Sequence, residues 1–434
     1  MAAIDQTIVA TALSTIHKDL HTGIEWSSWT ITIYSLGQLM VMPLAGKLSD
    51  TYGRKRVFVA AVVIFTIASL LCGLSTSIYM LVALRAAQAI GGGAFMPAAT
   101  GIIADHFGRE RDRALGMFTS IFPIGGIIGP VLGGIFVTDW SWRGIFLVNV
   151  PIGSILIVLA IVFLPKGSPR TSARLDVWGL ILLGTVLLSA MFGIAILGDG
   201  STSLLSLSFL LPEGIAVAAL VLFVLRMKSA ENPFIPLQLL RGRGFGVMNL
   251  INFLYGAAAL GFAALVPLYA QERFGVPVLQ AGTLLTARAV GVVCVAGLAV
   301  LALRRTGYRL PMIVGFLIIA AGLASMALKP PGVSPYLWLS LSGGITGVGM
   351  GLSVPATNNA SMQLATDQLA GVAGLRGMFR QAGSIMGVSI TTAILANSSA
   401  PGETLATAFI VFAAILVVVV VPMVFLVPDH RGRW

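Results

Sequence analysis

Long apolar runs separated by short polar segments dominate the chain. A helix needs about 20 apolar residues to cross the hydrocarbon core of a bilayer. Runs of this kind lie near residues 2–16, 28–48, 57–75, 79–104, 114–137, 144–164, 177–197, 210–225, 245–271, 279–302, 310–328, 337–362, 371–397 and 404–427. The apolar residues are continuous, whereas the strands of a membrane β-barrel alternate apolar and polar residues. The pattern therefore predicts an all-α polytopic membrane protein with 14 spans.

The first run is shorter than the others. Residues 2–16 would rise only about 22 Å as a helix, against a hydrocarbon core of roughly 30 Å. We therefore expect this span to be truncated, with residues missing before Met1. The segment also lacks a basic region followed by a cleavage site, so we predict no removable signal peptide.

Composition agrees with a membrane location. Hydrophobic residues make up 57% of the 434 residues, charged residues 10%, and the mean hydropathy is +0.95. The net charge of +11 comes from basic residues in short loops between apolar runs, so we expect no nucleic-acid partner. Cys72 and Cys294 are too far apart to indicate a disulfide framework or a metal cluster.

The basic residues also predict orientation. If the N-terminus is cytoplasmic, 21 of the 27 Lys and Arg residues lie on cytoplasmic segments, four on outer segments and two within spans. The cytoplasmic set includes Arg376 and Arg380, and the two intramembrane residues are Arg85 and Arg288. This asymmetry predicts a plasma or inner cell membrane protein with both termini in the cytoplasm.

Two short patterns recur at nearly the same offset and indicate an internal repeat. A glycine precedes Pro-Ala by six residues twice, and each time Gly-Met-Phe follows. The copies are Gly91 with Pro97 and Gly349 with Pro355, and the tripeptides span 116–118 and 377–379. The offsets are 258 and 261 residues. We predict two related six-helix halves, 1–164 and 243–434, with an inserted helix pair and cytoplasmic linker at 165–242.

The loop after the second run carries the most specific motif. Residues 46–56 read G-K-L-S-D-T-Y-G-R-K-R, in which a glycine permits a tight turn and an acid can pair with a base or cap the next helix. The loop resembles the signature G-x-L-x-D-x-x-G-R-[KR] of the major facilitator superfamily. That resemblance implies a cytoplasmic gate formed by Gly46, Asp50, Gly53, Arg54 and Arg56. The alternative is a solvated basic turn that only sets topology.

The second half lacks part of this motif. The equivalent stretch, residues 304–309, keeps a glycine and basic charge but has Arg304 where Asp50 stands. A gate role for this loop is therefore doubtful.

The fifth run contains a glycine strip. Gly125, Gly129 and Gly133 recur every fourth residue, beside a second stripe of Gly126, Pro130 and Gly134, a spacing that lets another helix approach closely. Residues 129–134 resemble the G-P-x-L-G-G motif that marks antiporters of the superfamily, which would make Gly125, Gly129, Pro130, Gly133 and Gly134 an antiporter strip. The alternative is ordinary helix packing.

Two charges lie within the first-half spans. Arg85 is followed one turn later by Gln88, and an arginine at mid-membrane requires a polar partner. Arg85 matches a fourth-helix motif of proton-driven exporters, and residues 3–9 resemble the first-helix motif of fourteen-helix drug:proton antiporters. The resemblance implies that Asp5 titrates and that Arg85 modulates its proton affinity. A permanent ion pair, or an Asp5 near the membrane surface, remains an alternative.

Several further stretches extend the resemblance over almost the whole chain. Residues 142–151, W-R-x-I-F-x-x-N-x-P, resemble the entry to the family's sixth helix, and 231–237 resemble its linker. In the ninth run, Asn249, Asn252 and Tyr255 recur every third residue. They could bind substrate in a central cavity, together with Gln88 and Arg288, or equally contact a neighbouring helix.

These observations predict proton-coupled efflux of small amphiphilic compounds by alternating access, driven by the proton gradient without a cofactor, in a monomer. One alternative is an exporter of lipids or uncharged amphiphiles, because Asp5 is the one acidic residue clearly inside the membrane. Another is a non-transporting membrane sensor or scaffold. The sequence contains no Ser/His/Asp set, metal cluster or phosphate-binding loop, so we expect no enzyme, no catalytic residues and no metal.

Overall fold

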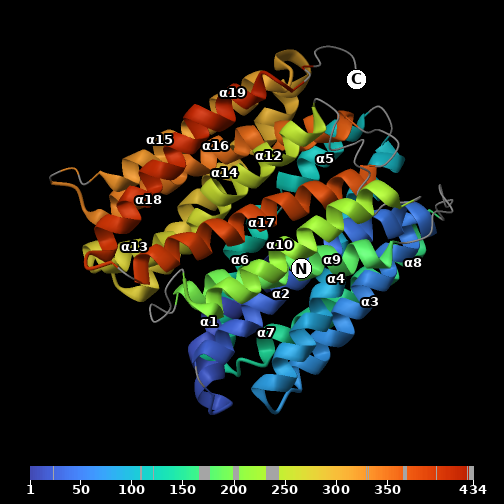
Figure 1. The fold of residues 1–434 in the computed structure, drawn as a ribbon, viewed down its shortest axis with the longest axis horizontal. Helices are drawn as coiled ribbons and strands as arrows, with labels where there is room; N and C mark the ends of the chain where they lie inside the picture. The colour runs from blue at the N-terminus through green and yellow to red at the C-terminus, as the bar shows by residue number, and fades with distance from the viewer. Residues whose placement is uncertain are drawn as a thin grey trace. The chain divides into compact units, whose positions relative to one another are not determined.

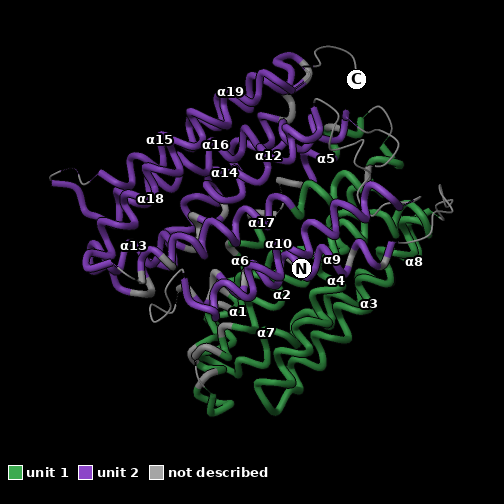
Figure 2. The backbone as a smooth tube through the Cα atoms, in the orientation of Figure 1, with its two compact units in different colours: residues 1–114, 121–172, 366–378 green, residues 115–120, 173–365, 379–434 purple. Residues whose placement is uncertain are grey.

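A computed structural model describes residues 1–22, 24–107, 110–120, 122–165, 176–198, 205–230, 244–328, 330, 332–364, 369–396, 398–427 and 429. Within these residues all regular elements are helices (Figure 1). The chain divides into two compact units, which Figure 2 colours separately. Unit 1 comprises residues 1–114, 121–172 and 366–378; unit 2 comprises 115–120, 173–365 and 379–434.

The helices of unit 1 coincide with the first six predicted runs. They are α1 (Ala2–Asp19), α2 (Ile24–Tyr52), α3 (Arg54–Gly73), α4 (Ile78–Phe107), α6 (Phe122–Asp139), α7 (Gly144–Leu147) and α8 (Asn149–Phe163). Two helices are divided between the units: α5 (Arg111–Ser120) and α17 (Leu369–Ala396).

Unit 2 contains the remaining helices. They are α9 (Val177–Gly198), α10 (Leu207–Ser229), α12 (Phe245–Tyr255), α13 (Phe262–Phe274), α14 (Val278–Thr306), α15 (Arg309–Ala327), α16 (Pro335–Gln363), α18 (Pro401–Ile415) and α19 (Val421–Val424), with π-helical segments η2 (Gly256–Gly261) and η4 (Leu416–Val420). The second segment ends just before Pro422, whose ring cannot fit a regular α-helical turn. The inserted pair α9 and α10 pack against each other.

Eight helices among the described residues are long and apolar enough to cross a membrane. This agrees with the predicted polytopic membrane protein. The finer prediction of 14 spans stays a prediction, because the number eight refers to the described residues alone.

The two units use the same internal packing. In unit 1, α4 packs against both α2 and α3; in unit 2, α16 packs against both α14 and α15. The two repeat glycines have equivalent roles, because a Cβ on Gly91 would meet the Ala61 carbonyl oxygen and one on Gly349 would meet that of Gly315. Gly53 (φ 96°) and Gly307 (φ 72°) each separate two helices in a conformation that favours glycine. These parallels support the duplication inferred from the sequence.

One expectation from the sequence is wrong. Asp5 is not the one acidic residue inside the membrane-length helices, because Glu213 lies in α10. This finding removes the argument for an exporter of uncharged molecules that rested on a single intramembrane acid. Arg376 and Arg380, which were counted with a cytoplasmic segment, lie inside α17, and the predicted orientation stays a prediction.

Candidate functional site

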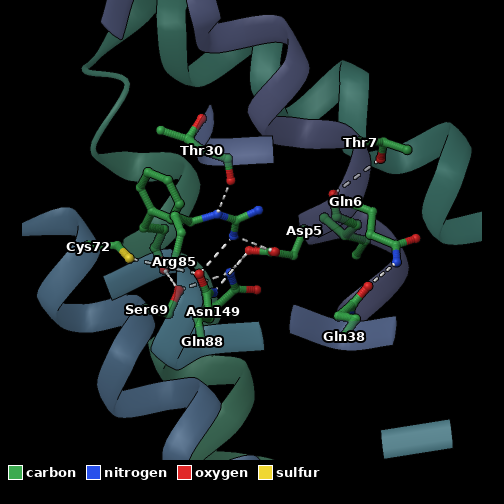
Figure 3. Close-up of polar contacts among 12 residues, drawn as sticks. Asp5, Gln6, Thr7, Thr30, Gln38, Ser69, Cys72, Arg85, Gln88 and Asn149 are labelled. Atoms are coloured by element: carbon green, nitrogen blue, oxygen red, sulfur yellow. Dashed lines mark hydrogen bonds and ion pairs between the residues drawn. The ribbon is translucent and has the colours of Figure 1, made fainter. Parts of the chain in front are cut away.

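A buried ion pair joins α1 and α4 at the centre of unit 1. Asp5 lies in the first turn of α1, and Arg85 is the eighth residue of α4. Arg85 Nη1 lies 2.7 Å from Asp5 Oδ2, and both side chains have no exposed surface (Figure 3). The sequence named both residues, and the fold brings them together across 80 positions.

Two amides complete the contacts of the Asp5 carboxylate. Gln88 Nε2 and Asn149 Nδ2 donate to Asp5 Oδ1 at 3.1 and 3.2 Å. Arg85 Nη1 also donates to Gln88 Oε1 at 2.7 Å, and Asn149 Nδ2 contacts the Ser69 hydroxyl at 3.1 Å. Asp5 therefore accepts hydrogen bonds from α4 and α8 as well as its ion pair, as Figure 3 shows. These donors come from helices remote from Asp5 in sequence.

Aromatic rings and a backbone carbonyl hold the other side of Arg85. Its Nε donates to the Thr30 carbonyl at 3.0 Å, and its Cζ lies 3.9 Å from the centre of the Tyr34 ring and 5.6 Å from that of Phe146. Guanidinium groups favour such ring faces. Arg85 Nη2 is buried without a hydrogen-bond partner in the described part of the chain. The cation is thus held firmly but is not fully satisfied.

The chemistry available to this cluster is proton binding. Its members are a carboxylate, a guanidinium, two amides and hydroxyls, all buried. Protonation of Asp5 would remove the charge that neutralises Arg85, and an unpaired buried charge costs several kcal/mol. Protonation of Asp5 would therefore weaken the contact between α1 and α4.

The glycine strip of α6 packs on the helix that carries Asp5. A Cβ on Gly125 would meet Ala3, one on Gly129 would meet the Thr7 hydroxyl, and one on Gly133 would meet that of Thr11. The prediction that this strip allows close helix approach is confirmed, and the approaching helix is α1. Gly126 and Gly134, on the second stripe, have no such neighbour, and the Pro130 side chain lies outside the described set.

The signature loop forms a charged cluster in unit 1. Arg54 lies 3.5 Å from Asp50 and 2.7 Å from Asp105, and it also donates to the Gly101 carbonyl. Asp50 Oδ2 accepts a hydrogen bond of 3.2 Å from the backbone N–H of Gly371, in the first turn of α17. Helix N-termini favour such carboxylates. The loop thus connects α2, α3, α4 and the beginning of α17.

Two members of the predicted gate have other positions. Gly46 is buried within α2, and Arg56 is exposed at the beginning of α3 with no ion pair among the described residues. The neighbouring Lys55 instead donates to the carbonyls of Ile161 and Leu164 at 2.7 and 2.6 Å, at the C-terminal end of α8. The structure therefore does not bring Arg56 into the charged cluster.

The second-half loop obtains a carboxylate from elsewhere in the chain. Asp429 Oδ1 accepts hydrogen bonds from the backbone N–H groups of Tyr308 and Arg309 at 3.0 and 3.3 Å, at the N-terminus of α15. The Arg309 side chain donates to the carbonyls of Val427 and Phe425. The acid missing from the loop sequence is replaced by a residue 121 positions away.

The predicted substrate residues are divided between the two units. Gln88 belongs to the Asp5 cluster in unit 1, and the other four belong to unit 2. Asn252 donates to the carbonyl of Met248 in its own helix at 2.7 Å. The Asn249 Nδ2 and Tyr255 Oη atoms are buried without a hydrogen-bond partner within the described ranges, and Arg288 donates to the Ala259 carbonyl at 3.4 Å.

Reasoning from sequence missed several members of the Asp5 cluster. The sequence analysis noted Asn149 only as the asparagine of the W-R-x-I-F-x-x-N-x-P string and predicted no role for it. Ser69, Thr30 and Tyr34 had no signal, because single polar residues in spans are common. The predicted linker, residues 231–237, lies outside the described residues.

Comparisons with known proteins agree with this arrangement. The family model of the Major Facilitator Superfamily matches residues 1–262 and 248–434. Multidrug resistance protein 3 of Bacillus subtilis is 30% identical over 403 residues, covering 92% of this chain and 77% of the relative. The multidrug resistance protein B homolog of Mycobacterium tuberculosis is 30% identical over 412 residues, covering 94% and 76%.

A solved structure shares the fold at low identity. The proton:xylose symporter XylE bound to 6-bromo-6-deoxy-D-glucose superposes with a TM-score of 0.68 at 14% identity, covering all of this chain and 94% of that one. At this identity the likeness establishes the fold alone.

Proposed function

The chain belongs to the Major Facilitator Superfamily, and on that premise we propose that it exports small amphiphilic compounds in exchange for protons. It is a multi-pass membrane transporter and not an enzyme. Its relatives of about 30% identity include transporters named for multidrug resistance, which supports efflux as the direction of transport.

The observation that carries this proposal is the Asp5 cluster. Asp5 is fully buried, and its bonding partner Arg85 has no second acidic partner in the described residues. Proton binding to Asp5 would release Arg85 and the amides of Gln88 and Asn149 from the carboxylate. The four groups come from three helices, so the protonation state of one residue favours one helix arrangement over another. Substrate and proton would then compete through the same conformational equilibrium.

The strip and the loop support alternating access. Gly129 and Gly133 place α6 directly on α1, so a displacement of α1 must be accommodated along that interface. Asp50 and Arg54 connect three helices of unit 1 to the beginning of α17. We propose that the strip acts as the antiporter element and the loop as the cytoplasmic gate of a fourteen-helix drug:proton antiporter. The two halves rock around a mid-membrane site.

The remaining elements of the proposal follow from this class. The partners are a small-molecule substrate, protons and the lipid bilayer, and the proton gradient supplies the energy without a cofactor. The protein acts as a monomer in the cell membrane, with both termini cytoplasmic. The 21 basic residues predicted on cytoplasmic segments support this orientation, although α17 places two of them within a helix.

The test is substrate-driven proton flux in proteoliposomes. Asp5→Asn keeps the side-chain shape and removes the titratable group. We expect this variant to bind substrate but to lose substrate-dependent proton movement. Asp19→Asn is a matched control, because Asp19 ends the same helix and is partly exposed. Proton flux that persists unchanged in Asp5→Asn would contradict the assignment of Asp5.

A further inference from the structure

Two arginines of unit 2 lie far from the ends of long helices. Arg288 is the eleventh of the 29 residues of α14, and Arg380 is the twelfth of the 28 residues of α17. At 1.5 Å per residue, each lies at least about 15 Å from either helix end. Arg288 lies in the middle of the apolar stretch Gln280–Ala299, and Arg380 lies well away from both ends of α17.

These arginines have no acidic partner among the described residues. Five other arginines have one: Arg54, Arg85, Arg143, Arg226 and Arg273 each form an ion pair with an aspartate or glutamate. The one hydrogen bond of Arg288 is the long contact to the Ala259 carbonyl, and both arginines keep partial exposure. Intramembrane charges normally pair with one another or with polar groups. A compensating anion is therefore missing from this part of the chain.

A buried tyrosine lies with the arginines. The Tyr255 hydroxyl is buried without a hydrogen-bond partner among the described residues. The next residue, Gly256, packs on the Arg380 carbonyl, and Ala259 of the same π-helical segment accepts the Arg288 bond. The ring of Tyr255 packs against Phe316, at 6.0 Å between ring centres, so the hydroxyl is held in place. Two cations and a free hydroxyl are the groups that recognise an oxyanion.

Glycines and a π-helix fix these three side chains. A Cβ on Gly256 would collide with the Arg380 carbonyl, and one on Gly383 with the Phe253 carbonyl, so α12, η2 and α17 are in backbone contact. The π-helical segment η2 begins directly after Tyr255, and its Ala259 carbonyl accepts the Arg288 bond. π-helical turns are frequently found at functional sites. The arrangement is built by the backbone and not by flexible side chains.

We propose that Arg288, Arg380 and Tyr255 bind the anionic head group of the exported compound, so that the substrates are amphiphiles that carry a carboxylate. This inference rests on the proposed export function. Arg288 and Arg380 bind the carboxylate oxygens and the Tyr255 hydroxyl donates a hydrogen bond to them. The apolar part of the substrate then determines affinity but not charge preference.

The test compares three probes with one ring system and different charge: 2-naphthoate, 2-naphthylmethanol and 2-naphthylmethylammonium. Binding to the full-length protein in nanodiscs is measured by equilibrium dialysis, without a pH gradient. We expect 2-naphthoate to bind at least about tenfold more tightly than the alcohol. Arg288→Gln and Arg380→Gln should each abolish this preference without weakening the alcohol. Arg288→Lys should retain part of it, and Tyr255→Phe should reduce it several-fold.

Matched controls separate the site from general charge effects. Arg305→Gln removes one exposed positive charge from the same helix as Arg288 and should leave the preference intact. Binding of the alcohol reports whether each variant is folded. Replacing chloride by gluconate tests an inorganic counter-ion. Suppose that chloride competes with 2-naphthoate, and that 2-naphthoate and 2-naphthylmethanol bind equally well when gluconate replaces chloride. The site then holds an inorganic anion, and the proposal is wrong.

The anion-site proposal can be wrong while the proton-coupling proposal stands, and the reverse also holds. Equal affinity of the acid and the alcohol, or a preference that survives in both glutamine variants, would overturn the arginine site and leave export open. Conversely, Asp5→Asn tests coupling and should not alter the charge preference at equilibrium. The two proposals therefore have separate readouts.

Discussion

Unit 1 and unit 2 share a packing plan and differ in how they treat charge inside the membrane. In unit 1, α4 packs on α2 and α3, and its buried cation Arg85 is neutralised by Asp5 at 2.7 Å. In unit 2, α16 packs equivalently on α14 and α15, but the partly buried Arg288 and Arg380 have no acidic partner in the described residues. The position of α16 that corresponds to Arg85 is Gly343.

This difference suggests a division of labour between related halves. A neutral ion pair can exchange a proton without taking up another ion, as the export proposal requires of Asp5. An unpaired dication gains most from binding an anion, as the carboxylate proposal requires of unit 2. A duplicated scaffold can thus diverge by replacing a few charged residues while its glycine contacts keep the same geometry.

Removal of a cation should have opposite consequences in the two units. Arg85→Met leaves Asp5 buried without its partner, and we expect a loss of about 3–5 kcal/mol of stability. Arg288→Met removes a charge that has no acidic partner, so its effect should be small or stabilising. Thermal unfolding in detergent measures both.

A double variant checks the cause of the first effect. Asp5→Asn with Arg85→Met should be less destabilising than the sum of the single changes, because no uncompensated charge remains. Equal destabilisation by Arg85→Met and Arg288→Met would remove the distinction between the two units.

The glycine contacts should separate proton coupling from anion binding. Gly129→Val forces a side chain onto Thr7 of α1, and Gly347→Val forces one onto the Arg288 backbone of α14. We expect each to cost about 1–3 kcal/mol by overpacking. The first should impair proton flux and the second the preference for 2-naphthoate. Gly134→Val is the control, because no atom lies near its Cβ position; a comparable loss in this variant would argue against specific packing.

Asp50 and Asp429 each accept hydrogen bonds at a helix N-terminus, and their substitution compares the signature loop of unit 1 with the equivalent loop of unit 2. Asp50→Asn weakens the bonds to Arg54 and to the Gly371 N–H, and Asp429→Asn weakens those to the N-terminus of α15. Each should cost about 1 kcal/mol. Because Asp50 belongs to the proposed gate, Asp50→Asn should also slow transport, whereas Asp429→Asn should mainly lower the melting temperature. The measurement is the transport rate of each variant at matched protein levels. Equal transport rates for Asp50→Asn and Asp429→Asn would contradict the prediction.

Surface ion pairs at the ends of helices should matter least. Asp19 accepts bonds from Trp142 and Arg143, and these donors lower the pKa of its carboxyl below the usual 3.8. The resulting stability is present above the usual pKa and is lost as the pH falls through the lowered one. Because the pair is partly exposed, Asp19→Asn should cost less than about 1 kcal/mol at neutral pH.

Unit 2 provides the parallel case. Arg273 lies 3.0 Å from Glu403, whose side chain is largely exposed, so Glu403→Gln should have an equally small effect. Melting curves between pH 3 and pH 7 test both variants. A large loss at neutral pH in either one would contradict this ranking.

Much of the fold could be predicted from the sequence, because membrane helices leave a local signal. Each apolar run coincides with helical segments, and the turn at Gly53 was predicted from the same glycine that adopts φ 96°. Run boundaries were less accurate: α2 extends to Tyr52, beyond the predicted end at residue 48. Hydropathy changes gradually at the membrane surface, whereas a helix ends where its backbone bonds end.

The candidate sites were predictable only in part. Asp5 and Arg85 were found because a charge within an apolar run is costly wherever it lies. Asn149 and Asp429 were not found, since an amide in a span and an acid near a chain end have many ordinary roles. Arg380 was counted with a cytoplasmic segment, although it lies within the predicted run 371–397.

By itself, the sequence determined that this chain is a helical membrane protein, and it marked Asp5, Arg85 and Arg288 as charges within its spans. Those properties depend on the free-energy cost or gain of burying each side chain, which is set by the residue type and does not depend on the fold. Only the tertiary structure decided that Asp5 is paired with Arg85, that Asp429 caps α15, and that Arg288 and Arg380 have no acidic partner among the described residues. Pairing depends on distances between helices that are remote in sequence, and close packing through glycines sets those distances.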